Sequence, residues 1–356
     1  MRAPTHRLAV LLCLLTACGS DDSEPTADPS ADTQIRQSTD GVEPLAQEAD
    51  TCGVATARPR NLTLRGNLGT HDPVIIAAGG RYYEYQTGKF VYAKVSNDLI
   101  NWDPLPSQFP RVWDWMKRQV PGITDDLWAP DISFFGGKYH LYYSGSTFGS
   151  NRSCIGHATR TDLASGSWKD ENGVICSNTG GPKQDYNAID PNVVVDEGGT
   201  PWMSFGSFWS GIKLIKLTSD GKRADDTLIS IAARPSNSGE LEAPFIVRRC
   251  GYYYLFVSFD RCCKGKDSTY RVMVGRSKSV TGPYVDKSGR AMTQGGGTQV
   301  VAGNGTWKGP GHNAILQDKG KWYNVYHAYR ASNGAAELRI TEMGWDADGW
   351  PMSHAP

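Results

Sequence analysis

The sequence lacks an excess of charge of either sign, because 37 Lys and Arg residues balance 37 Asp and Glu residues. Without a basic or acidic surplus, nothing in the composition favours nucleic acid or an anionic membrane surface as a partner. The chain also lacks the glycine loop between a strand and a helix that binds nucleotides. Helical periodicity is scarce apart from a short insert predicted near residues 111–117. These absences favour an all-β protein with a neutral ligand.

An apolar run long enough to cross a bilayer is missing from the N-terminal region. Residues 8–15 (LAVLLCLL) follow Arg2 and Arg7 and have the length of a signal-peptide core. Residues 15–18 (LTAC) resemble a bacterial lipobox, which predicts that residues 1–18 are a lipoprotein signal peptide and that Cys18 is acylated. Ordinary signal cleavage nearby is the alternative.

The stretch at residues 19–60 is rich in Asp, Ser, Thr, Pro and Ala and has almost no aromatic side chains. Such a segment buries too little apolar surface to order itself, so we expect a disordered linker. Together with the signal peptide, it predicts an exported lipoprotein of the bacterial cell surface or periplasmic membrane, or one released outside the cell. Contact with the membrane is expected only through the lipid anchor.

Six cysteines remain once Cys13 and Cys18 are set aside, and an even number in an exported chain predicts disulfides. The sequence leaves their connectivity open, although Cys154 and Cys176 fall in neighbouring predicted strands. The adjacent Cys262 and Cys263 either bond to each other or pair elsewhere. No CxxC motif or histidine cluster accompanies the cysteines, which argues against a cysteine-ligated metal site.

The middle of the chain contains one unit of a repeat. Residues 186–195 (YNAIDPNVVV) place an acidic residue and a proline before a β-branched run, and residues 198–202 (GGTPW) turn the chain into a second strand. Equivalent units are centred on positions 73, 130, 191, 244 and 313, the last without its proline, at steps of 57, 61, 53 and 69 residues. Five units, each with room for four short strands, predict a single-domain five-bladed β-propeller over residues 61–356.

The first strand of each blade lines the axis of a propeller, so the residues before these strands converge at one mouth of the central channel. The residues at the position before the proline are Asp72, Ala129, Asp190, Ala243 and His312. Glu242 stands one position earlier, so three carboxylates from three blades should meet. When carboxylates lie that close together, their repulsion raises the pKa of at least one of them. One carboxyl can then stay protonated as an acid while another is ionised as a base at neutral pH, as glycoside hydrolysis requires. Asp131 follows its proline and is interpreted as a strand-end cap or a support behind the site.

Several motifs resemble those of glycoside hydrolase family 43. Its three carboxylate motifs have counterparts at residues 71–73 (HDP), 188–191 (AIDP) and 242–245 (EAPF). Motifs similar to those of its endo-1,5-α-L-arabinanases occur at residues 127–131 (LWAPD), 206–211 (GSFWSG) and 309–314 (GPGHNA). The resemblance extends from about residue 69 to the C-terminus.

The resemblance implies a five-bladed propeller that cleaves internal α-1,5-L-arabinofuranosidic bonds of arabinan, a pectin side chain, with inversion. Asp72 would be the general base, Glu242 the general acid, and Asp190 the carboxylate that tunes and orients the acid. Inversion needs room for a water molecule, so the base and acid are expected about 6.5–9.5 Å apart.

Alternative functions remain open. One is an exo-acting arabinanase, an arabinofuranosidase or a xylosidase of the same family, in which a loop blocks one end of the groove. The segment at residues 109–124 and the loop at Cys262 and Cys263 are the candidates for such a loop. Another is a non-catalytic glycan-binding propeller lipoprotein, which is expected to lack one of the three carboxylates.

Other residues are expected to bind sugar or an ion. The resemblance implies that His312 faces a calcium or similar ion in the central channel, and water must supply most ligands because calcium takes about six to eight oxygens. Sugar binding calls for aromatic platforms beside polar groups. The predicted substrate contacts are the aromatic Trp128, Phe208 and Trp209 and the polar His71, Asn187, Ser207 and His327. We expect the protein to act as a monomer.

Overall fold

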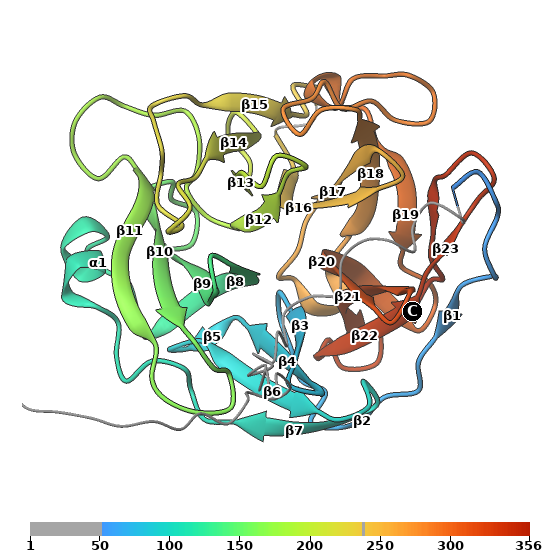
Figure 1. Cartoon of the computed structure of the whole chain (residues 1–356), viewed down its shortest axis with the longest axis horizontal. Helices are drawn as coiled ribbons and strands as arrows, with labels where there is room; N and C mark the ends of the chain where they lie inside the picture. Colours follow the sequence, from blue (N-terminus) through green and yellow to red (C-terminus); the bar gives the residue numbers. More distant parts are fainter. Residues whose placement is uncertain (1–51, 237–238) are drawn as a thin grey trace, which may run out of the picture. The chain divides into compact units, whose positions relative to one another are not determined.

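The computed structural model describes residues 52–236 and 239–356. Within these residues, five sheets surround a central axis as the blades of a β-propeller (Figure 1). The fold predicted from the repeat is confirmed. The predicted signal peptide, Cys18 and most of the predicted linker lie outside the described residues.

Each blade begins with its innermost strand and runs outward. Blade 1 contains β3 (Val74–Ala78), β4 (Arg81–Gln86), β6 (Tyr92–Ser96), β7 (Asn101–Leu105) and, at its edge, β2 (Arg65–Gly66). Blade 2 contains β8 (Asp126–Phe135), β9 (Lys138–Gly145), β10 (Ser153–Arg160) and β11 (Lys169–Ser177), with β5 (Gly88–Lys89) beside β8. Blade 3 contains β12 (Asn192–Val195), β13 (Pro201–Phe205), β14 (Ile212–Lys216) and β15 (Ile229–Ala232).

The last two blades follow the same order. Blade 4 contains β16 (Leu241–Arg249), β17 (Tyr252–Phe259), β18 (Arg271–Ser277) and β19 (Thr298–Ala302). Blade 5 contains β20 (Trp307–Asp318), β21 (Lys321–Arg330), β22 (Ala336–Glu342) and β1 (Arg60–Asn61). A small hairpin of β23 (Gly344–Trp345) and β24 (Pro351–Met352) follows. The helical elements are α1 (Asp114–Gln119), within the predicted insert, and the single turns η2 (Gly265–Asp267) and η3 (Met292–Gln294).

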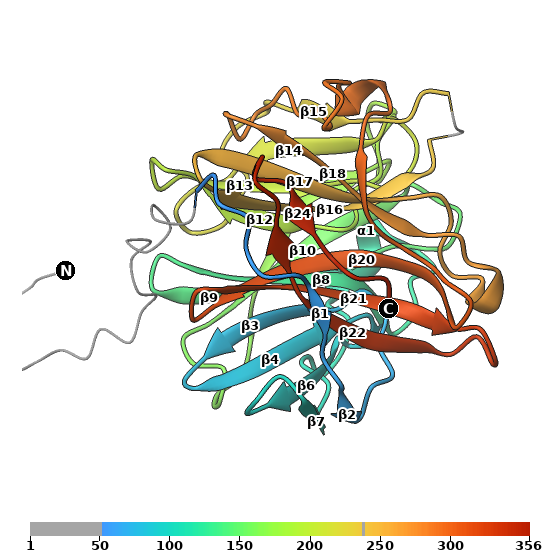
Figure 2. The ribbon, with the colours of Figure 1, turned by 90° about the vertical axis from the view of Figure 1, so that its right-hand side faces the viewer.

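The N-terminal strand β1 closes the ring of blades. It pairs antiparallel with β22, so that the first described strand completes the sheet of the last blade (Figure 2). A disulfide between Cys52 and Cys250 ties the preceding residues to the turn between β16 and β17. The predicted linker extended to residue 60, but residues 52–60 already contact the propeller through this disulfide and β1. The folded domain therefore begins earlier than the sequence indicated.

The aligned residues of the innermost strands β3, β8, β12, β16 and β20 share one backbone conformation. The five residues aligned by the repeat all have left-handed backbone, with φ of 54° at Asp72, 46° at Ala129, 58° at Asp190, 57° at Ala243 and 48° at His312. This conformation is uncommon for residues other than glycine, and a residue before proline is normally extended. In β8, β16 and β20 the register with the next strand shifts across this residue, as in a β-bulge. The repeat alignment therefore holds in three dimensions, and strained backbone gathers where function is expected.

The core lies between the blades and is rich in aromatic side chains. The predicted aromatic second strands contribute buried residues such as Tyr83, Tyr143 and Tyr254. Trp102 on the outer strand β7 is buried too. No helix among the described residues has the length and apolar character needed to cross a membrane.

Two further disulfides complete the pairing of the cysteines. Cys154 and Cys176 are direct partners across β10 and β11, where their predicted neighbouring strands placed them. Cys262 and Cys263 are bonded to each other. The structure therefore selects the vicinal bridge from the two arrangements that the sequence left open.

Candidate active site

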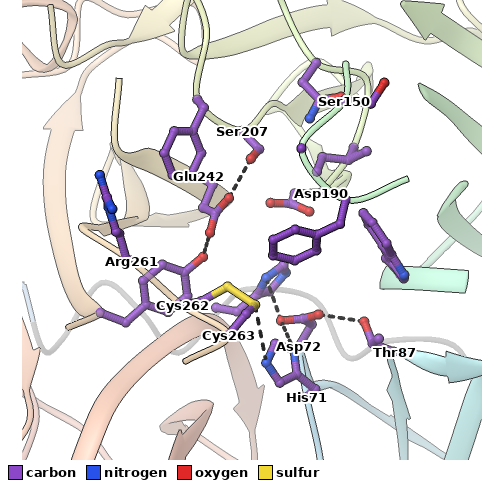
Figure 3. A pocket seen from close by; sticks show the side chains of 18 of the residues that line it. His71, Asp72, Thr87, Ser150, Asp190, Ser207, Glu242, Arg261, Cys262 and Cys263 are labelled. Carbon is purple, nitrogen blue, oxygen red and sulfur yellow. Dashed lines mark hydrogen bonds and ion pairs between the residues drawn. A yellow bond between two sulfur atoms is a disulfide. The ribbon is translucent and has the colours of Figure 1, made fainter. Parts of the chain in front are cut away.

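A cavity of about 730 Å³ lies where the innermost strands begin (Figure 3). All five blades contribute to its lining, and the volume is in the range of small-molecule pockets. The predicted site residues that line it are His71, Asp72, Trp128, Asn187, Asp190, Ser207, Phe208, Trp209, Glu242 and His312. His327, which was also predicted to contact substrate, does not line the cavity.

Asp72, the predicted base, is held directly before β3. Its Oδ1 lies 2.9 Å from Nδ1 of His71 and 3.1 Å from Nδ1 of His312, and its Oδ2 accepts the Thr87 hydroxyl at 2.6 Å. Its backbone N–H donates to Nδ1 of His327 at 3.1 Å. Burial alone would raise the pKa of this carboxyl, but the neighbouring imidazoles of His71 and His312, both within hydrogen-bond distance of Oδ1, hold the pKa well below its ordinary value. Asp72 is therefore ionised at neutral pH, as a base must be.

Glu242, the predicted acid, sits at the bulge that opens β16. The Ser207 hydroxyl donates to its Oε2 at 2.5 Å, and the Tyr270 hydroxyl donates to its Oε1. Burial and, second, the negative charge of Asp190 raise the pKa of Glu242 to about 8. The side chain therefore keeps its proton at neutral pH. When Glu242 is protonated, its O–H can donate to the oxygen of either hydroxyl, because a hydroxyl group both donates and accepts.

Asp190 links the third blade to the fourth. Its backbone N–H donates to the Ser144 hydroxyl at 3.1 Å, and its Oδ2 accepts the backbone N–H of Ala243 at 3.1 Å. The second bond places the carboxylate against the residue next to Glu242. Burial raises the pKa of Asp190 to about 6, with the charge of Asp72 adding to the rise and that of His312 opposing it. Asp190 and Glu242 titrate as a coupled pair, in which Glu242 has the higher pKa.

Asp131 lies behind the site and does not line the cavity. Its Oδ1 accepts the side-chain amide of Asn192 at 3.2 Å, and its Oδ2 accepts the backbone N–H of Val193 at 2.8 Å. Burial raises the pKa of Asp131 to about 7. It joins the innermost strands of blades 2 and 3, which agrees with the supporting role predicted for it.

His312 lies in β20 at the fifth equivalent position. Burial lowers the pKa of its imidazole, but the Asp72 carboxylate outweighs burial and raises the pKa to about 9. Its Nδ1 faces the Asp72 carboxylate at 3.1 Å. One group of three described His, Cys, Asp or Glu side chains has ligand atoms within 4.8 Å of one another, namely His71, Asp72 and His327.

That group is a poor donor set for calcium, because calcium prefers oxygen ligands. It supplies two imidazoles and one carboxylate, it does not include His312, and most of its donor atoms already bond within the protein. This group of three described residues therefore does not fit calcium. The ion expected from the resemblance stays a prediction, and we derive no chemical step from it.

The two other histidines predicted to contact substrate both bond within the protein. His327, on β21, is fully buried, and its ring stacks on His71 with 4.0 Å between ring centroids. It therefore supports Asp72 from behind, and the expectation of a sugar contact does not hold for it. His71 lines the cavity, but its Nδ1 faces Asp72 and its Nε2 lies 2.6 Å from the Tyr329 hydroxyl. Both of its ring nitrogens are therefore already used.

Aromatic side chains border the cavity on the side of blades 2 and 3. Trp209 is 44% exposed, and the sequence did not single out Phe148, which is 84% exposed and packs edge-on against Trp128. Phe148 follows the end of β9 at the same distance as Phe208 follows the end of β13. Aligning the second strands of the two blades would therefore have revealed it.

Other residues that line the cavity are not marked by any motif of the sequence repeat. Thr87 and Tyr270 bond to the carboxylates from other strands or blades, and the loop at residues 261–264 forms part of the wall. Cys262 and Cys263 lie in this loop, one of the two segments predicted to border the groove. The other segment, residues 109–124, contributes no lining residue.

A five-bladed propeller that presents an ionised Asp and a protonated Glu to one cavity has the architecture of a glycoside hydrolase. Residues 62–351 match the glycosyl hydrolases family 43, and the chain belongs to this family.

Relatives of known activity cover most of the chain. The extracellular endo-alpha-(1->5)-L-arabinanase 1 of Bacillus subtilis (strain 168) is 48% identical over 286 residues, 79% of this chain and 86% of that protein. The extracellular exo-alpha-(1->5)-L-arabinofuranosidase ArbA of Cellvibrio japonicus (strain Ueda107) is 42% identical over 299 residues, 79% of this chain and 85% of that protein. The solved structure of the GH43 endo-arabinanase from Bacillus licheniformis superposes with a TM-score of 0.78 at 49% identity, covering 82% of this chain and 99% of that one.

Proposed function

We propose that the protein hydrolyses α-1,5-L-arabinofuranosidic bonds within arabinan, acting at internal bonds and inverting the anomeric centre. The observation that carries this proposal is the convergence of Asp72, Asp190 and Glu242 on one cavity, where histidines bond to Asp72 and hydroxyl groups bond to Glu242. In this cavity the histidine neighbours lower the pKa of Asp72, while burial and the charge of Asp190 raise that of Glu242. The family and the 48% identical endo-acting relative support arabinan as the substrate.

The proposed reaction uses three side chains. The Asp72 carboxylate takes a proton from a water molecule as the water oxygen attacks the anomeric carbon. Glu242 gives its proton to the glycosidic oxygen as the bond to the leaving sugar breaks. Asp190 keeps the pKa of Glu242 high until the transfer, because its charge disfavours a second carboxylate beside it. Afterwards Asp72 releases its proton to solvent and Glu242 regains one.

Exo action is the second candidate, and one observation favours it. The wall at Cys262 and Cys263 borders the cavity, and the relative that is 42% identical carries an exo-acting name. Against this, the segment at residues 109–124 stays away from the cavity, and the lining draws on every blade. We therefore favour a groove that accepts the chain on both sides of the cleaved bond.

Product lengths over time test the proposal. Purified protein is incubated with linear arabinan, branched arabinan and xylan, and the products are separated by length at early time points. A spread of intermediate oligosaccharides from linear arabinan is expected. One short product from the start would establish exo action, and no product from any of the three glycans would refute the proposed hydrolysis.

We further propose that the protein is exported and held to a membrane by a lipid on Cys18, and that it acts as a monomer. The lipobox-like residues 15–18 support the anchor. The extracellular location named for both relatives supports export.

A further inference from the structure

The disulfide between Cys262 and Cys263 stands in the wall of the cavity, beside His71 and across from Glu242 (Figure 3). A disulfide stabilises a fold mainly by closing a loop of the unfolded chain, and the gain grows with loop length. Here the sequence separation is 1, whereas Cys52 and Cys250 are 198 residues apart. The Cys262–Cys263 bridge therefore contributes little to global stability through loop closure. Its position at the cavity indicates a local role.

The bridge restrains one backbone amide that points at the site. The backbone N–H of Cys263 donates to the Tyr329 hydroxyl at 3.0 Å. Cys263 has a left-handed φ of 65°, which the ring closed by the disulfide helps to hold. On its far side the loop is fastened by the Lys264 N–H, which donates to the Ser268 hydroxyl at 2.9 Å.

From this amide, hydrogen bonds lead to Asp72 in a consistent direction. The Tyr329 oxygen accepts from Cys263, so its single proton is free to go to Nε2 of His71, 2.6 Å away. A neutral imidazole that accepts at Nε2 carries its proton on Nδ1. That nitrogen lies 2.9 Å from Oδ1 of Asp72, so the chain of donors ends on the carboxylate. Tyr329 itself does not line the cavity, whereas Cys263 and His71, which its hydroxyl contacts, both do.

We propose that the Cys262–Cys263 disulfide is a positioning element for the reaction. It holds the Cys263 amide as the first donor of a one-way hydrogen-bond chain through Tyr329 and His71 to Asp72. The chain keeps His71 in the Nδ1–H tautomer and so fixes the orientation of the Asp72 carboxylate. The catalytic consequence rests on the proposed function, whereas the tautomer does not.

The tautomer is measured first, because it is independent of any substrate. Nitrogen NMR of full-length protein with 15N-labelled histidine distinguishes the two ring nitrogens, and a His71→Gln spectrum assigns the signal among the 7 histidines. A protonated Nδ1 and an unprotonated Nε2 are expected. In Cys262→Ala/Cys263→Ala and in Tyr329→Phe, the Nε2–H form should appear. Protonated Nε2 in the unaltered protein, or an unchanged tautomer in the cysteine variant, overturns the proposal.

Kinetics on linear arabinan then test the consequence. Cys262→Ala/Cys263→Ala and Tyr329→Phe should each lower kcat about ten-fold with KM unchanged, as when a supporting contact behind a reacting group is lost. The variant carrying all three substitutions should lose no more than either parent, because both act through one chain. A raised KM with unchanged kcat would mean that the disulfide only contacts sugar, which contradicts the proposal. Additive losses of kcat in the triple variant would mean that the disulfide and Tyr329 act independently, which also contradicts it.

Two matched controls separate positioning from stability. Tyr284→Phe removes a buried hydroxyl bond to the Val280 carbonyl, remote from the cavity, and Cys52→Ala/Cys250→Ala removes the long-range bridge. Both should lower the Tm while kcat stays unchanged. If the unaltered protein does not cleave arabinan, the proposed function fails, and the NMR result still decides whether the hydrogen-bond chain exists.

Discussion

The coupling between Asp190 and Glu242 makes the pH dependence of the reaction a direct test of the site. Glu242 must be protonated to act, so kcat/KM should fall as the pH rises through the pKa of about 8. Replacing Asp190 by Asn removes a negative charge from the neighbourhood of Glu242 and keeps an oxygen that can accept the Ala243 N–H. The pKa of Glu242 must then fall, because its ionised form no longer meets a like charge.

The size of the shift follows from the causes of the raised pKa. Burial is the largest cause and is unchanged by the substitution, while the charge of Asp190 is the second. A like charge in contact range is worth about one to three pKa units, and the neighbouring His312 cation offsets part of it. We therefore expect the alkaline limb to move down by about one pH unit, which corresponds to about 1.4 kcal/mol.

The assay is the initial rate of reducing-end release from linear arabinan between about pH 4 and pH 10, at substrate concentrations well below KM so that kcat/KM is measured. Asp226→Asn is the control, because it removes a negative charge from an exposed position that does not line the cavity. The control should leave the limb in place. An alkaline limb that does not move in Asp190→Asn would refute the tuning role of this residue.

Four further results are expected. Glu242→Gln and Asp72→Asn should each lower kcat on linear arabinan at least about a hundred-fold while arabino-oligosaccharide binding stays measurable by calorimetry, and a variant that retains turnover loses its assigned role. Phe148→Ala should raise KM several-fold with little change in kcat, because the exposed ring offers a sugar platform; an unchanged KM would exclude it from the groove. If an ion occupies the central channel, dialysis against a calcium chelator should lower the Tm, and calcium should restore it; an unaltered Tm and activity would contradict the ion. Cys18→Ser should move the protein from the membrane fraction to the soluble fraction, and continued membrane association would contradict the lipid anchor.

A silent glycan-binding propeller fits the site poorly. Such a protein needs no acid, yet Asp72, Asp190 and Glu242 all line the cavity, and each is bonded to neighbouring protein groups. Keeping a buried carboxylate ionised costs free energy unless other groups compensate it, and here two histidines compensate Asp72. Two carboxyls held in opposite protonation states suit acid and base catalysis.

The sequence by itself was enough to predict the blades and the three carboxylates. A propeller repeats one local pattern, and the five units mark their innermost strands at aligned positions, four of them with a proline. Equivalent sequence positions then occupy equivalent places around the axis, so Asp72, Asp190 and His312 converge without any knowledge of contacts between blades. Aromatic residues in loops after a strand, such as Phe208, followed from the same local reading.

Only the tertiary structure decided how the carboxylates differ. Their pKa values depend on burial and on charges from other blades, and the partners Thr87 and Tyr270 stand where no repeat motif marks them. The start of the domain was also a tertiary matter, because β1 is ordered by pairing with β22 and not by its own composition. Local sequence patterns thus specify where strands begin, while the protonation states and the Cys52–Cys250 bridge arise from groups that meet only after the ring of blades has closed.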